Sequence, residues 1–139
     1  MIIGNAGLSG MSNKGKGGRT ERELIHLFHD TGNFAPIRIA GSGSTPLPAP
    51  DIVVGGKGKV FAIECKSGKK ERYIDPQQIK ELLEFSAKFG AIPLVGVRFD
   101  REGWWFLAVN DLKQSKAGNY RVDLELAKEK GVSFNELIS

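Results

Sequence analysis

The sequence predicts an α/β domain with a central mixed β-sheet of about five strands flanked by helices. A helical apolar stripe occupies the first third of the chain, paired apolar runs of strand length follow it, and a second helical segment lies between such runs. With 139 residues, 40% of them hydrophobic, the chain is long enough for one domain with its own core.

Composition excludes several classes of protein. The single cysteine, Cys65, rules out an internal disulfide and a zinc site built from several cysteines, and it favours a reducing, intracellular (cytoplasmic) location. No apolar run approaches the roughly 20 residues of a membrane span, so no membrane partner is expected. A net charge of +4 is compatible with binding to nucleic acid.

The N-terminal residues 1–17 are predicted to form a flexible basic arm, followed by a single domain over 18–139. Glycine, serine and asparagine dominate this segment, and Lys14 and Lys16 would give it contacts with phosphates. A disordered tail without a role is the alternative. The first helix is predicted to start with a capping box, Thr20 as N-cap and Glu23 at N3, and to end near Gly32.

A β-hairpin over 51–66 is the centre of the prediction. After a short strand at 35–39 and a Gly/Ser/Pro loop at 41–50, two apolar runs flank a glycine-rich turn. Such a turn brings Asp51 and Glu64 to the same end of the two strands. Because strand side chains alternate between faces, Glu64 and Lys66 share one face and Cys65 points to the other.

Two carboxylates and an ammonium at one end of a sheet suit a divalent cation. Asp51 and Glu64 would supply the carboxylate oxygens that Mg²⁺ prefers, and substrate phosphate would complete the coordination. Lys66 could orient or deprotonate an attacking water, or offset the charge on the phosphate. A strand that ends in a solvated salt bridge remains the alternative from these three residues alone.

The remaining elements follow in order. A basic turn precedes a second helix with Asp75 as N-cap, Pro76 at N1 and Gln78 at N3, which ends at Gly90. Strands are predicted at 92–99 and 104–109 around a turn at 100–103. The C-terminal segment 110–139 is predicted to be a loop and a short helix that opens with the capping box at 133–136.

Six segments together resemble one family. GRTERELI at 18–25, RIAGSGS at 38–44, PDIV at 50–53, IECK at 63–66, LEF and FG around 83–90, and GWWF at 103–106 occur in the order and spacing of the archaeal Holliday-junction resolvases, within the PD-(D/E)xK nuclease superfamily. The resemblance covers roughly 18–110. It implies a restriction-endonuclease-like fold and a homodimeric, Mg²⁺-dependent endonuclease that cuts four-way DNA junctions, with Mn²⁺ as an expected substitute.

The resemblance also implies residue roles. The catalytic residues would be Glu21, Ser42, Asp51, Glu64 and Lys66, and the metal ligands Asp51, Glu64 and, directly or through water, Glu21. DNA would be bound by Arg22, Arg38, Ser42, Ser44 and Gln78, with the basic arm and turn adding Lys14, Lys16, Arg19, Lys69, Lys70 and Arg72. Extra prolines between 44 and 51 and a long N-terminal arm depart from the family pattern.

Two rival functions stay open. One is another nuclease of the superfamily that acts on duplex or flap DNA, and the other is a DNA-binding module that does not cut. A dimer is expected because a junction presents two equivalent strands and the chain contains no repeat that could supply a second site. Its predicted surface joins the strand at 104–107 to the C-terminal Phe134, Leu137 and Ile138, and the alternative is that these side chains complete the monomer core.

Overall fold

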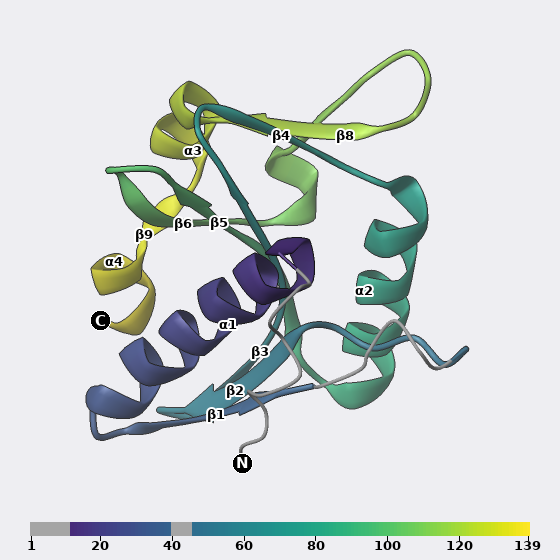
Figure 1. The fold of residues 1–139 in the computed structure, drawn as a ribbon. Helices are drawn as coiled ribbons and strands as arrows, with labels where there is room; N and C mark the ends of the chain where they lie inside the picture. The colour runs from purple at the N-terminus through teal and green to yellow at the C-terminus, as the bar shows by residue number, and fades with distance from the viewer. Residues whose placement is uncertain (1–11, 40–45) are drawn as a thin grey trace.

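A six-stranded mixed sheet organises the chain, in a computed structural model that describes residues 12–39 and 46–139 (Figure 1). The strands lie in the order β1-β2-β3-β5-β6-β9, and a separate small sheet has the order β4-β8-β7. No helix in the described ranges has the length and apolar content needed to cross a membrane. The elements are α1 Ser12–Asp30, β1 Phe34–Arg38, β2 Ile52–Gly56, β3 Lys59–Gly68, β4 Glu71–Ile74, α2 Pro76–Phe89, β5 Ile92–Phe99, β6 Gly103–Leu107, the 3₁₀ helix η3 Val109–Asp111, β7 Lys113–Gln114, β8 Tyr120–Asp123, α3 Leu124–Lys130, β9 Val132–Ser133 and α4 Phe134–Ile138.

The predicted hairpin is confirmed. Strands β2 and β3 pair antiparallel, with Ile52 opposite Ile63. Lys57 and Gly58 between them have φ values of 53° and 77°, and two such left-handed residues make the tight turn whose twist matches that of the strands. Strand β3 then pairs in parallel with β5 after the α2 crossover, which makes the sheet mixed.

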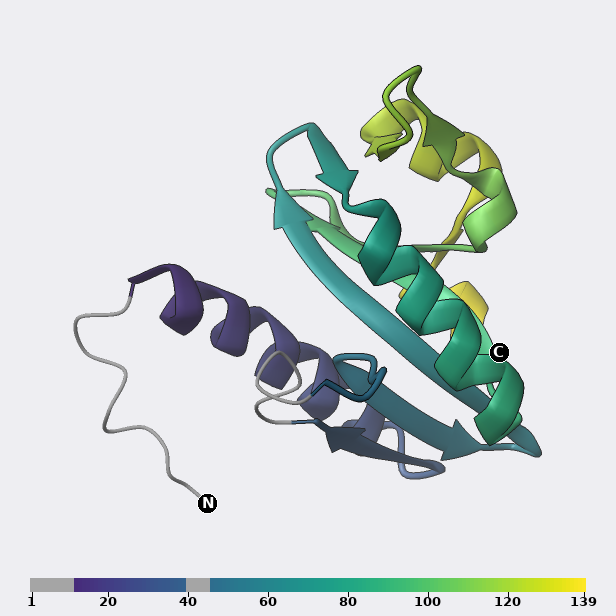
Figure 2. The ribbon, with the colours of Figure 1, turned by 90° about the vertical axis from the view of Figure 1, so that its right-hand side faces the viewer.

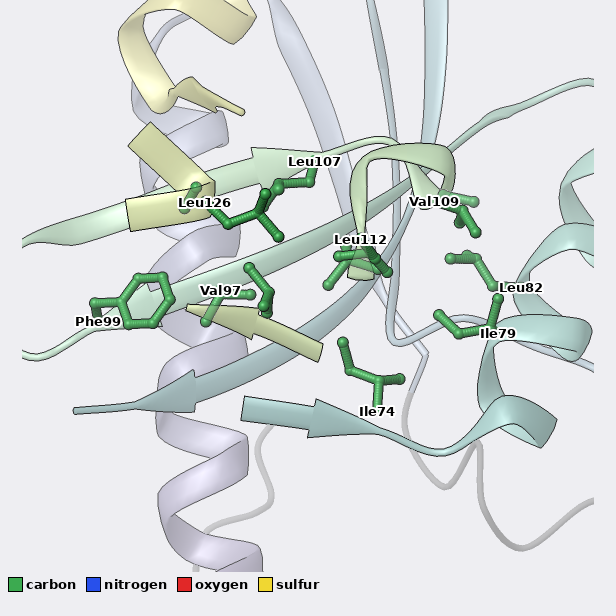
Figure 3. Close-up of a cluster of buried hydrophobic side chains, with 13 residues drawn as sticks. Ile74, Ile79, Leu82, Val97, Phe99, Leu107, Val109, Leu112 and Leu126 are labelled. Atoms are coloured by element: carbon green, nitrogen blue, oxygen red, sulfur yellow. The ribbon is translucent and has the colours of Figure 1, made fainter. Parts of the chain in front are cut away.

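Helices α1 and α2 lie on opposite sides of the sheet (Figure 2). On the α1 side, Leu24 and Phe28 pack against β2 and β3 residues such as Ile52 and Ile63. On the α2 side, Ile79 and Leu82 pack against the other face of β5 and against η3, β8 and α3 (Figure 3). Both faces of the central strands are therefore covered, as their apolar runs require.

The predicted ends of α2 are confirmed. The Asp75 side chain accepts a hydrogen bond from the Gln77 N–H, Pro76 opens the helix, and Gly90 closes it at φ 84°. The C-terminal capping box is also present, because Ser133 and Glu136 exchange side-chain-to-backbone hydrogen bonds.

The predicted start of the first helix is wrong. Helix α1 begins at Ser12, so Thr20 lies inside the helix, and Lys14 and Lys16 lie in its first turns. Glycines at 15, 17 and 18 are poor helix formers, which is why local propensity favours an arm. The guanidinium groups of Arg22 and Arg38 lie close to Gly18, where an added Cβ would meet them at 3.0 and 3.4 Å. Residues 1–11 of the predicted arm lie outside the described residues.

The C-terminal segment contains more structure than a loop and a short helix. Residues 109–133 form η3, β7, β8, α3 and β9, and β9 adds a sixth strand next to β6. Strand β8 pairs with β4, the segment that the sequence predicts to be a basic turn. These strands have two to four residues each, too few for side-chain alternation to distinguish them from loops.

Most side chains of the predicted dimer surface are buried within the single chain. Trp104 and Phe106 are buried in the α1-side core, and Leu107 is buried in the α2-side core. Phe134 is half-buried, with its ring centroid 5.0 Å from that of Phe28 and 6.4 Å from that of Phe106. These side chains, together with the half-buried Leu137 and Ile138, complete the core of a single chain, so they do not form an exposed patch.

Candidate active site

A carboxyl pair lies inside the sheet where the hairpin strands meet. The Asp51 N–H donates to the Ile63 carbonyl over 3.1 Å, which continues the β2–β3 pairing one step beyond β2. The Asp51 Oδ2 atom accepts the Cys65 N–H at 2.9 Å. Glu64 lies between these two contacts on β3 and is only 6% exposed. The predicted meeting of Asp51 and Glu64 is thus confirmed.

This pair carries an excess of negative potential. Burial, followed by the neighbouring Asp51 charge, raises the pKa of Glu64 to about 8, against the opposing effect of Lys66. Burial also raises the pKa of Asp51, and the hydrogen bond from the Cys65 N–H opposes that rise. The two carboxyl groups therefore resist ionising together, which favours a proton on Glu64. A bound cation would relieve the repulsion that favours this proton.

Glu21 of α1 approaches the pair but has a partner of its own. Burial and then the charge on Asp51 raise its pKa, so the two carboxyl groups lie within electrostatic reach of each other. The Arg38 Nε–H donates to Glu21 Oε1 at 2.8 Å. In the parts of the chain that the structure describes, no three Asp, Glu, His or Cys side chains converge as a metal-binding group. Glu21 thus lies beside the Asp51–Glu64 pair with its Oε1 atom already bound to Arg38.

Lys66 extends from the same strand beside Glu64. Its Nζ atom lies 3.8 Å from Glu64 Oε2 and donates to Gln78 Oε1 at 3.0 Å.

Cys65 packs into the core on the other face of the sheet, which confirms the predicted division of faces. Burial, with the nearby carboxylates, raises the pKa of its thiol well above the usual value, so this cysteine stays protonated and is no nucleophile.

The donor chemistry of the pair fits Mg²⁺. Carboxylate oxygens are hard ligands, and Mg²⁺ binds through one or two of them while it retains water and substrate oxygens. Asp51 and Glu64 supply two such groups, and the sulfur of the neighbouring Cys65 does not compete with them because it packs into the α1-side core. The two buried carboxyl groups also repel each other, which a divalent cation offsets.

Basic side chains gather next to Glu21. Arg22 is exposed and Arg38 is half-buried, and both guanidinium groups converge over Gly18. An open cleft of about 560 Å³ continues along α1, lined by Arg19, Thr20, Arg22, Glu23, His26 and Arg98. Sequence reasoning missed Arg98, although the signal was present: it is the one charged residue in the apolar strand 92–99.

Glu23 connects this cleft to the core instead of capping a helix. Its Oε1 atom accepts from Arg98 Nε and from Trp104 Nε1, both at 2.7 Å. The predicted capping role is therefore wrong, because the residue lies well inside α1. The contact fixes the direction of Arg98 at the edge of the cleft.

The other predicted DNA-binding residues are more widely spread. Lys69 and Lys70 are exposed in the turn after β3, and Arg72 lies across Gly68, where an added Cβ would meet Arg72 Cγ at 2.9 Å. Gln78 faces Lys66. Ser42 and Ser44 lie outside the described residues. The structure thus groups Glu21, Asp51, Glu64, Lys66 and Gln78 around one point, with Arg22 and Arg38 beside them.

Comparisons with known proteins identify the family of this chain. The family model described as archaeal Holliday junction resolvase (Hjc) matches residues 12–139. The chain is 37% identical over 131 residues to the crossover junction endodeoxyribonuclease Hjc of Archaeoglobus fulgidus, covering 88% of this chain and 95% of that protein. It is 38% identical over 125 residues to the protein of that name from Methanocaldococcus jannaschii, covering 88% and 86%. The 1.6 Å structure of the A. fulgidus Hjc, a Holliday junction resolvase, superposes with a TM-score of 0.79 at 33% identity and covers 86% of this chain and 96% of that one.

Proposed function

The chain belongs to the archaeal Holliday junction resolvase family and is a crossover junction endodeoxyribonuclease, and from this premise we propose how its residues cut DNA. The fold is restriction-endonuclease-like, as the structural match to Hjc indicates. The observation that carries the proposal is the close placement of Asp51, Glu64 and Lys66 at the end of one hairpin.

Asp51 and Glu64 hold the metal in this proposal. Bound there, Mg²⁺ supplies a water of lowered pKa and offsets the charge that develops on the phosphate oxygens; Mn²⁺ is expected to substitute. Glu21 contributes negative charge from α1, through its second carboxylate oxygen directly or through water, since Arg38 already donates to its Oε1 atom. Ser42 remains a proposed contributor from the family resemblance alone.

Lys66 acts on the reacting groups. Its ammonium orients the attacking water and supports the phosphate, since it keeps two donor hydrogens beyond the one given to Gln78. The attack is in line with the departing 3′-oxygen, and the products carry a 3′-hydroxyl and a 5′-phosphate, as in the family that the sequence resembles. Burial of the site, with Lys66 only 15% exposed, strengthens this electrostatic support.

Arginines and lysines bind the DNA backbone. Arg22 and Arg38 lie beside the carboxyl pair and would hold the phosphates that flank the cut. Arg19 continues this row along α1, while Lys69, Lys70 and Arg72 line the turn after β3. Lys14 and Lys16, in the first turns of the helix, remain proposed contributors from the sequence alone. Such contacts read the shape of a junction and carry no base sequence.

The active form is proposed to be a homodimer. Two symmetric nicks need two catalytic sites, and a second copy of the chain would supply the second Asp51–Glu64 pair. Because the strand that contains Trp104 is buried, we place the dimer contact at an open apolar hollow on α2. This hollow is lined by Phe85, Phe89 and Pro48 with Glu84 and Lys88. Phe89 is 56% exposed although it stacks on Phe85 at 4.9 Å. A second copy of the chain would cover these two rings. Across a two-fold axis, the opposite charges of Glu84 and Lys88 in one copy could face those of Lys88 and Glu84 in the other.

The experiment that tests this function compares three substrates in one assay. A four-way junction, a flap and a linear duplex of matched sequence are incubated with the protein and Mg²⁺, and each strand is labelled in turn. Paired nicks at symmetric positions in the junction, with no cleavage of the linear duplex, are the expected result. Equal cleavage of all three substrates would mean that the protein is a nuclease of the same superfamily that does not select junctions.

A further inference from the structure

The ammonium of Lys66 lies between two acceptors of unlike charge. Its Nζ donates to the neutral Gln78 Oε1 at 3.0 Å, while the nearest oxygen of the ionisable Glu64 lies further away, at 3.8 Å. The lysine is thus held by a side chain from α2, on an element other than its own strand. An unrestrained ammonium would move toward the carboxyl pair, where the negative potential is strongest.

We propose that Gln78 is a positioning residue, which keeps the Lys66 ammonium off the carboxyl pair and directed at the water and phosphate. This inference rests on the proposed role of Lys66 and deepens it. Without Gln78, Lys66 would close the 3.8 Å gap to Glu64 and occupy the carboxylate oxygen that the metal needs. Cleavage would then lose both a ligand oxygen and a correctly placed cation.

The chemical type of residue 78 matters in this role. A glutamine oxygen accepts a hydrogen bond without neutralising the donor, so the full charge of Lys66 remains available to the phosphate. A glutamate at the same place would also accept the hydrogen bond, but it would pair with the lysine and add another carboxylate to Glu21, Asp51 and Glu64. Phosphate would meet more repulsion there.

Helix α2 makes Gln78 a rigid support. The Asp75 cap and Pro76 fix the first turn, and the next residue, Ile79, is 1% exposed in the α2-side core. The adjacent glutamine, Gln77, faces the other way and donates to Glu81 at 3.1 Å on the exposed side of the helix. Gln77 is therefore a control of the same type, on the same turn, without a contact to Lys66.

The family resemblance implies a different role for Gln78, direct contact with DNA. The two roles differ in what they change. A DNA contact contributes to junction affinity, whereas a residue that acts through Lys66 contributes to the rate of cleavage after binding. The structure favours the second role because the side-chain oxygen of Gln78 already accepts from Lys66.

The experiment compares Gln78→Met, Gln78→Glu and Gln77→Met. Methionine preserves length and volume but removes the acceptor. Single-turnover cleavage of a four-way junction in Mg²⁺ gives the rate, and a gel shift in Ca²⁺ gives the Kd. A third readout uses the metal-free protein: the ¹⁵N-labelled Lys66 ammonium is observed by NMR, with its signal assigned by its loss in Lys66→Ala.

Both Gln78 variants are expected to cleave the junction about 10-fold to 100-fold more slowly than wild type, because misplacement of a catalytic group lowers the rate by about this factor. The Kd of Gln78→Met for the junction should stay within about twofold of the wild-type value. The Lys66 signal should shift or broaden in Gln78→Met and stay unchanged in Gln77→Met. Wild-type cleavage by Gln78→Met, or an unmoved Lys66 signal, would overturn the inference. A Kd that rises in proportion to the lost rate would assign Gln78 to DNA contact instead.

If the proposed catalytic role of Lys66 fails, the cleavage rates differ from those expected when only the positioning role of Gln78 fails. If Lys66→Ala cleaves at the wild-type rate, Lys66 has no catalytic role and the function proposed for it fails, whatever Gln78 does. If Lys66→Ala is inactive while Gln78→Met retains full activity, only the positioning role is lost. Thermal unfolding of each variant, expected to match that of wild type within a few degrees, separates these outcomes from misfolding.

Discussion

The carboxylate of Asp51 accepts the backbone N–H of Cys65 over 2.9 Å, so a side chain at the start of one strand is tied to the main chain of the next. Residue 65 follows Glu64 directly, so this contact holds the Asp51 carboxylate next to the residue that carries the second carboxyl group. Glu64 belongs to β3, and Asp51 lies one residue before β2 and is tied to β3 by two hydrogen bonds, which gives the site the rigidity that metal-assisted chemistry needs.

The first prediction concerns stability and pH in the absence of divalent metal. The pKa of Glu64 is raised from its usual 4.5 to about 8, mainly by burial, so between these values the folded chain holds a proton that the unfolded chain has lost. The free energy of unfolding should therefore fall as pH rises through this interval, by at most about 1.4 kcal/mol per pH unit. Thermal unfolding in EDTA measures the slope.

Glu64→Gln is the control for this slope. Glutamine cannot ionise, so the stability of the variant should depend much less on pH and should exceed that of wild type above pH 8. An equal slope in the variant would mean that other groups produce the effect. Added Mg²⁺ should raise the stability of wild type most at high pH, where the pair is ionised.

The second prediction concerns the arginines over Gly18. Arg22→Ala should weaken junction binding and reduce the slope of log Kd against log salt by about 1, because one phosphate contact is lost. Lys130→Ala, which removes an exposed cation at the end of α3, should leave that slope unchanged. Gel shifts over a salt series measure both. Identical slopes in the two variants would remove Arg22 from the DNA interface.

The third prediction uses two neighbouring tryptophans. Trp104→Phe removes the indole donor to Glu23. Trp105→Phe removes an indole N–H that is buried without a partner among the described residues. The loss of unfolding free energy should thus be greater for Trp104→Phe, by about 1 kcal/mol. Urea denaturation of both variants measures the difference, and a larger loss for Trp105→Phe would contradict the Glu23 contact.

The fourth prediction concerns the oligomer. Wild type should sediment as a dimer at micromolar concentration, and Phe89→Asp should be a monomer because it places a charge inside the apolar hollow on α2. Ile37→Asp changes an apolar side chain that is 63% exposed on β1, outside that hollow, and should remain a dimer. A monomeric wild type would remove the dimer proposal, while a dimeric Phe89→Asp would move its interface elsewhere.

Strong local patterns could be predicted from the sequence. The β2–β3 hairpin has two apolar runs and a glycine-rich turn, so its register, and with it the meeting of Asp51 and Glu64, follows from alternation. Helix α2 has a side-chain cap at Asp75 and a glycine stop at Gly90, and both ends lie where those residues indicate. The family resemblance added the roles of Glu21, Arg22 and Arg38.

What could not be predicted depends on contacts between distant segments. The start of α1 continues through glycines next to Arg22 and Arg38, and Glu23 bonds to Trp104, which is 81 residues away. Strands such as β9 are too short to show a period, and they form because β6 offers an edge. The burial of the strand at 103–107 could not be predicted for a related reason: β9 and α4 cover it, which apolar composition alone could not reveal.

Cleavage of a four-way junction by Asp51→Asn tests the central claim most directly. Asparagine keeps an oxygen that can accept the Cys65 N–H, so the hairpin geometry survives while the ligand charge is lost. The expected result is a loss of Mg²⁺-dependent nicking by about 10³-fold or more, with junction affinity unchanged or tighter because repulsion against phosphate has fallen. Nicking by Asp51→Asn at the wild-type rate would contradict the assignment of the Asp51–Glu64 pair as the catalytic centre.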